Sequence, residues 1–158
     1  MKFFGNDTAN QKIEMLKKVP VFRELTRKEL LAVDSLLYER TYEKDEILFE
    51  EGDPGHGIFI ILSGKARARS SSKLLAGDAF EFGPGDLVGE LTLFDEAPRM
   101  ATVVAMERTQ TVALFQAEFS SLLTRNKNIG VKVLMAISGT MSRRVRRLLL
   151  QETGLPSV

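Results

Sequence analysis

The length, composition and charge of the chain exclude several classes of protein. It has 158 residues, of which 44% are hydrophobic and 27% charged, and its formal net charge is +1. These values predict one globular domain with a sizeable core, and the absence of cysteine excludes disulfides, thiolate metal sites and cysteine nucleophiles.

Two amphipathic helices are predicted at the start of the chain. Residues 10–19 carry apolar side chains at helical spacing and end before a proline. Thr26 and Glu29 then have the spacing of a capping box, followed by an apolar stripe of period 3.6. We therefore expect a second helix that begins after Thr26 and runs to about Leu37.

The pattern changes over residues 39–116, where short apolar runs alternate with glycine, proline and aspartate. Residues 58–62 and 102–105 are the clearest strands. Regular alternation of strand and turn predicts a closed barrel of the jelly-roll or double-stranded β-helix type. The turn signals are Glu51 to Gly55, Ser63-Gly64, Ala76 to Asp78 and Phe82 to Asp86.

Helical spacing returns over residues 117–152 and predicts a short helix followed by a long one. The long helix could be locally loosened at Gly139. The chain, residues 1–158, thus reads as a single mainly β domain with flanking N-terminal helices and a long C-terminal helix. No apolar run approaches the roughly 20 residues of a membrane span, and the N-terminus lacks the apolar core of a secretory signal. We therefore expect a cytoplasmic protein without membrane contact.

Residues 89–103 hold the most informative cluster. Leu91 to Phe94 would form the first turn of a short helix, whose unpaired backbone N–H groups favour an anion. Arg99 could place a guanidinium on the same anion. Glu90 would repel a bare phosphate, but it can accept a hydrogen bond from a sugar hydroxyl. This combination indicates a ribose cyclic phosphate.

The same residues carry a resemblance to a known family. Gly89-Glu90-Leu91 followed by Pro98 to Val103 resembles the phosphate-binding cassette of cyclic-nucleotide-binding domains. Three glycine-marked strand pairs, at residues 47–55, 58–65 and 82–86, are similar to those of the family, and the resemblance covers about residues 16–149. It implies a jelly-roll sensor that binds a cyclic nucleotide and uses no cofactor, metal or covalent chemistry.

The resemblance also implies residue roles. Glu90 would bind the ribose 2′-hydroxyl and Arg99 an exocyclic phosphate oxygen, while Gly89 would let the backbone approach the ligand. Met100 stands where relatives that favour cGMP often carry a hydroxyl, so cAMP is the expected ligand and cGMP the alternative. The backbone amides of Leu91, Thr92 and Ala101 would complete the phosphate cradle; Leu87, Val88 and Val103 would lie near the base; and Val145, Leu148 and Leu149 are the lid candidates.

Other charged residues have simpler interpretations. His56 lies between two glycines and is expected to be a solvated loop residue. The arginines at 143, 144, 146 and 147 are expected to form the basic face of an amphipathic helix, because too few residues follow them for a DNA-reading module. That helix could pair with its copy in a homodimer or contact a protein partner. The simpler interpretation of Arg99 and Glu90 is a partly exposed salt bridge that holds a turn. The competing functions are an interaction domain of the same fold that binds no nucleotide, and the sensor half of a transcription regulator.

Overall fold

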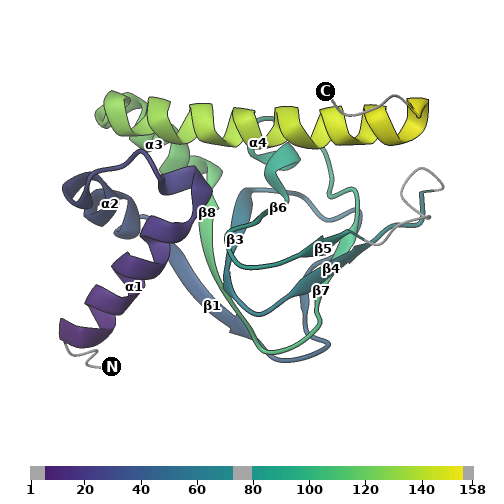
Figure 1. Cartoon of the computed structure of the whole chain (residues 1–158), viewed down its shortest axis with the longest axis horizontal. Coiled ribbons are helices and arrows are strands. Elements are labelled where there is room, and N and C mark those ends of the chain that lie inside the picture. Colours follow the sequence, from purple (N-terminus) through teal and green to yellow (C-terminus); the bar gives the residue numbers. More distant parts are fainter. Residues whose placement is uncertain (1–5, 73–79, 155–158) are drawn as a thin grey trace.

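The structure is a computed structural model that describes residues 6–72 and 80–154 (Figure 1). In this part of the chain two four-stranded antiparallel sheets form the predicted jelly roll, with strand orders β1-β8-β3-β6 and β2-β7-β4-β5. The expected turn at Ala76 to Asp78 lies outside the described residues. The strands are β1 (Tyr38–Tyr42), β2 (Ile47–Phe49), β3 (Gly57–Ser63), β4 (Ala66–Arg69), β5 (Glu81–Phe82), β6 (Leu87–Val88), β7 (Thr102–Ala105) and β8 (Thr109–Phe115).

Residues 58–62 of strand β3 are all apolar because both faces of the strand are largely buried. Ile58 and Ile60 pack against the helices, whereas Ile61 faces the other way, into the barrel. All three side chains are fully buried. The sheet that contains β3 therefore separates two apolar clusters, one under the helices and one inside the barrel, which explains an uninterrupted apolar run in an antiparallel sheet.

The N-terminal helices are α1 (Asn6–Lys18), the 3₁₀ helix η1 (Pro20–Phe22) and α2 (Arg27–Asp34). The capping box is confirmed: Thr26 Oγ1 accepts a hydrogen bond from the Glu29 amide at 3.2 Å, and the Glu29 carboxylate accepts one from the Thr26 amide at 2.8 Å. The predicted end of the helix at Leu37 is wrong. The amides of Leu36 and Leu37 donate to carbonyl oxygens three residues back, which tightens the chain while Leu37 stays buried.

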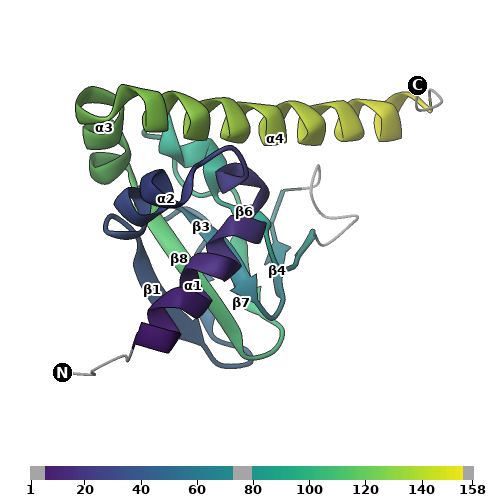
Figure 2. The same cartoon turned by 60° about the vertical axis from the view of Figure 1, so that its left-hand side comes forward.

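Helices α3 (Gln116–Arg125) and α4 (Lys127–Thr153) follow the barrel, as predicted. Helix α4 continues through Gly139, so the local loosening expected there does not interrupt the helix. Figures 1 and 2 show α4 lying across one end of the barrel, with α3 at its start. The fully buried Val133 and Ile137 fix the first half of α4 on the core. None of the helices within residues 6–72 and 80–154 combines the length and the apolar character that a membrane span requires.

Candidate functional site

The predicted cassette begins where β6 turns into a short 3₁₀ helix, η2 (Glu90–Leu93). This helix starts one residue earlier than expected and ends before Phe94. Gly89 enables the turn, because its φ of 77° lies in the left-handed region, which favours glycine. A Cβ at this position would lie 2.2 Å from Arg99 Nη1. The chain therefore needs glycine here both for the turn and for space beside the guanidinium.

The backbone of Arg99 is anchored by the turn at residues 51–55. The Arg99 amide donates to the Asp53 carbonyl oxygen, and the Gly52 amide donates to the Arg99 carbonyl oxygen, both at 2.8 Å. Pro54 and Pro98 form an isolated antiparallel bridge beside these bonds. Two segments that lie far apart in the sequence thus fix the position from which the Arg99 side chain enters the barrel.

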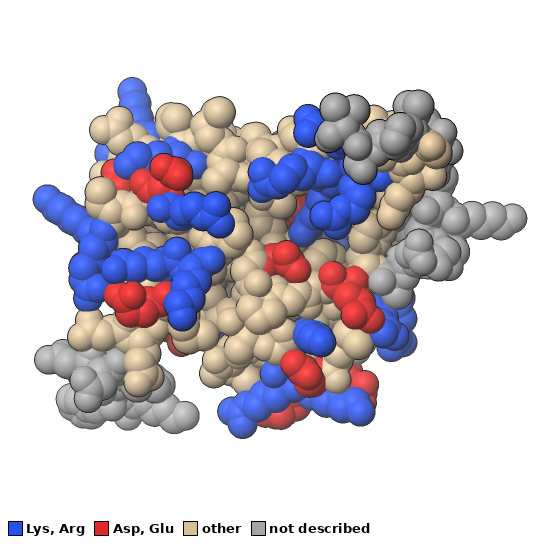
Figure 3. Space-filling model, viewed as in Figure 1, with Lys and Arg blue, Asp and Glu red and all other residues tan. Residues whose placement is uncertain are grey.

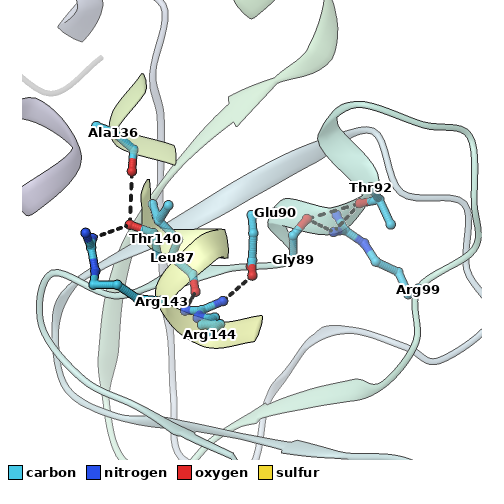
Figure 4. A network of polar contacts seen from close by, with 9 residues as sticks. All are labelled: Leu87, Gly89, Glu90, Thr92, Arg99, Ala136, Thr140, Arg143 and Arg144. Carbon is cyan, nitrogen blue, oxygen red and sulfur yellow. Dashed lines mark hydrogen bonds and ion pairs between the residues drawn. The ribbon is translucent and has the colours of Figure 1, made fainter. Parts of the chain in front are cut away.

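The Arg99 side chain points inward toward η2 (Figure 4). Only 6% of the residue is exposed. Nη1 donates to the Gly89 carbonyl oxygen at 2.9 Å and to Thr92 Oγ1 at 2.8 Å, and Nη2 donates to the Gly57 carbonyl oxygen at 2.8 Å. The guanidinium carbon lies 4.1 Å from the centre of the Phe49 ring.

Among the residues that the structure describes, no anion is directly paired with the positive charge of Arg99. Within the described part of the chain, its hydrogen-bond acceptors are carbonyl and hydroxyl oxygens, and no carboxylate forms a salt bridge with it. Its Nε is buried and has no hydrogen-bond partner there. Burial lowers the pKa of Arg99 from its usual value, while Asp53 and Glu90 act in the opposite direction. Because guanidinium stays protonated in proteins, the site holds a buried cation suited to an anionic ligand.

Glu90 is the buried carboxylate of the same site, with 5% of the residue exposed. Its Oε1 accepts a short charge-assisted hydrogen bond from Nη1 of Arg144 on α4. Nη2 of Arg144 donates to the Leu87 carbonyl oxygen on β6 (Figure 4). Helix α4 is therefore attached to the cassette through a pair of opposite charges.

These elements enclose a pocket of about 270 Å³ between the barrel, the cassette and α4. Among the residues that the structure describes, the charged ones that line the pocket are Glu90, Arg99 and Arg144. The rest of the lining is largely apolar. Two predicted residues do not line the pocket. Leu87 packs instead in the apolar cluster under the helices, and Leu149 is rotated by about 100° along the helix from Leu148. The predicted residues that do line it are Val88, Gly89, Glu90, Leu91, Thr92, Arg99, Met100, Ala101, Val103, Val145 and Leu148.

Comparison with known proteins decides the family. A protein-family model with the description "Cyclic nucleotide-binding domain" matches residues 39–126, which is more than half of the chain. The chain belongs to the cyclic-nucleotide-binding domain family. The jelly roll is therefore that of a cyclic-nucleotide-binding domain.

Three relatives illustrate the similarity. The domain is 34% identical over 113 residues to the cyclic AMP receptor protein of Thermus thermophilus, covering 70% of this chain and 51% of that protein. It is 30% identical to a cAMP-dependent protein kinase regulatory subunit of Hypocrea atroviridis, covering 74% of this chain and 26% of that one. A solved cyclic nucleotide-binding domain from Methylobacillus flagellatus is 25% identical, with a TM-score of 0.80 and coverage of 100% and 91%. The chain thus spans about half or less of the two curated relatives.

Sequence reasoning missed the role of Arg144 in this cyclic-nucleotide-binding domain, and it missed other pocket residues, among them Met141, Phe49 and Phe82. The four-arginine segment that contains Arg144 reads as one basic face, and Figure 3 shows basic side chains gathered along α4. Yet Arg144 is three positions after Met141 and four before Leu148, and all three line the pocket. That spacing was the available signal. His56 is exposed, as expected, and the described residues contain no group of three side chains that could hold a metal ion.

Proposed function

We propose that this domain binds a 3′,5′-cyclic mononucleotide and acts as a sensor without covalent chemistry. The observation that carries the proposal is Arg99, a buried guanidinium without a salt-bridge partner among the described residues, beside the glycine turn that opens η2. An anion in the pocket would balance its charge. Glu90 lines the same pocket and offers an acceptor for a sugar hydroxyl next to that anion.

The remaining lining suits a purine nucleotide. The cyclic phosphate would be held by Arg99 and by backbone amides of Leu91, Thr92 and Ala101, as the family resemblance implies. The base would lie against the apolar wall that includes Val88 and Val103. Met141, Val145 and Leu148 reach the pocket from α4, so a bound base would contact the helix directly. Ligand occupancy would then bias the position of α4, which passes the signal to a partner in the cytoplasm.

We expect cAMP to bind more tightly than cGMP. Met100 lines the pocket with 57% of the residue exposed and carries no hydroxyl to mark a guanine. Isothermal titration calorimetry with both nucleotides tests this order. In Met100→Thr a hydroxyl is added at the same position, so the affinity for cGMP should rise about tenfold, the effect of roughly one new hydrogen bond, while that for cAMP stays similar. Tighter binding of cGMP by the unsubstituted chain would contradict the proposal.

Helix α4 is also the proposed surface for a second copy of the chain. Val131, Met135 and Val145 are large apolar side chains of α4 with more than half of each residue exposed, a common feature of helices that pair. Light scattering coupled to gel filtration should give twice the mass of one chain, and Met135→Glu should return it to one. A mass of 17.6 kDa for the unsubstituted chain at high concentration would refute the dimer.

A further inference from the structure

Arg144 joins α4 to three other segments of the site. Its guanidinium donates to Glu90 in η2 and to the Leu87 carbonyl oxygen in β6. Its Cζ also lies 5.4 Å from the centre of the Phe82 ring in β5, within the range of a cation–π contact. An arginine held by an anion, a carbonyl oxygen and an aromatic ring is fixed in one arrangement, unlike the exposed arginines beside it on α4.

Arg144 supplies the opposite charge and the hydrogen bond for the buried Glu90 carboxylate. Only 7% of the Glu90 side chain is exposed, and among the described residues Arg144 is its one hydrogen-bond and salt-bridge partner, through Oε1. Burying a carboxylate is costly unless it is paired. The pair therefore offsets the cost of burying the Glu90 carboxylate and fixes its direction, with Oε2 left as a further acceptor.

The charges around the pocket support the same role. Glu90, Arg99 and Arg144 are its described charged lining residues, and together they carry one net positive charge. A cyclic phosphate carries one negative charge, so lining and ligand together would be neutral.

We infer that Arg144 is a positioning residue for recognition of the ribose 2′-hydroxyl, an inference that rests on the proposed function. Arg144 holds Glu90 by Oε1 and thereby presents Oε2 to the sugar. It acts on the sugar through Glu90, so its contribution depends on the presence of the 2′-hydroxyl. A purely steric lid contact from α4 would instead stabilise ribose and deoxyribose ligands equally.

Calorimetry with cAMP and 2′-deoxy-cAMP separates these two roles. In Arg144→Met we expect the affinity for cAMP to fall about tenfold, the equivalent of one charge-assisted hydrogen bond, and that for the deoxy analogue to change much less. Arg144→Lys keeps the charge but not the planar fork, so it should restore only part of the preference for cAMP. Arg147→Met removes an exposed arginine of α4 that does not line the pocket, and it should change neither affinity.

The Arg144→Met substitution in a Glu90→Gln background distinguishes a loss of positioning from misfolding. Arg144→Met leaves a buried carboxylate unpaired, whereas Glu90→Gln with Arg144→Met removes both charges and should fold well. In the Glu90→Gln background, adding Arg144→Met should not reduce the preference for cAMP any further. Equal losses of both nucleotides in Arg144→Met, or no loss, would overturn the inference. If the unsubstituted chain binds neither nucleotide, the proposed function itself has failed.

Discussion

Replacing Arg99 by methionine is expected to lower the affinity for cAMP by about a hundredfold or more. The side chain is buried and forms no salt bridge with any described residue. In the proposed complex it makes two hydrogen bonds to a charged phosphate, each worth roughly 1.5–3 kcal/mol, and tenfold in affinity corresponds to about 1.4 kcal/mol. Isothermal titration calorimetry measures the loss directly.

The control for this substitution is an arginine on a strand of the same barrel. Arg67 on β4 forms an exposed salt bridge with Glu81 and does not line the pocket. Arg67→Met removes an arginine at small cost, because exposed ion pairs contribute little, and cAMP affinity should be unchanged. Arg99→Lys should bind cAMP weakly, since a single ammonium cannot reproduce the geometry of the guanidinium. Equal heats of cAMP binding for Arg99→Met and the unsubstituted chain would refute the proposed site.

The second large effect is expected for Gly89→Ala. Alanine would adopt the left-handed φ of 77° at a cost of about 1–2 kcal/mol. Its Cβ would also lie 2.2 Å from Arg99 Nη1 and 3.2 Å from Phe49 Cζ. The guanidinium must then move away from its place beside η2. We therefore expect a loss of cAMP affinity of about tenfold or more in calorimetry, together with a lower free energy of unfolding in urea.

Gly52→Ala separates backbone strain from displacement of the arginine. Gly52 also has a left-handed φ, 87°, but a Cβ there would meet no atom within 4 Å. It should lower the free energy of unfolding by a similar strain. Because alanine keeps the backbone amide that donates to the Arg99 carbonyl oxygen, it should leave cAMP affinity nearly intact. A matching loss of affinity in both variants would show that the clash with Arg99 is not the cause. Circular dichroism spectra confirm that both proteins are folded before the titrations are compared.

Local rules predicted much of this fold, and they were least accurate where helices end. The capping box at Thr26 is a contact between residues three apart, so its sequence suffices to place the start of α2. The strand at residues 102–105 is likewise visible in its β-branched run. The end of α2 was misplaced, because Leu37 is buried by tertiary packing whether or not its backbone is helical.

The amino-acid sequence was enough to predict the family of the chain, its jelly-roll class and the meeting of Glu90 and Arg99 in one pocket. These follow from local motifs, whose spacing is preserved however the domain packs. Only the tertiary structure decided which arginine of α4 meets Glu90. Neighbouring helical positions point about 100° apart, so the docking of α4 on the barrel turns Arg144 inward and leaves Arg143, Arg146 and Arg147 exposed. That rotation is set by the packing of buried residues such as Val133 and Ile137 against the core, an interaction between distant segments that no local pattern of charges specifies.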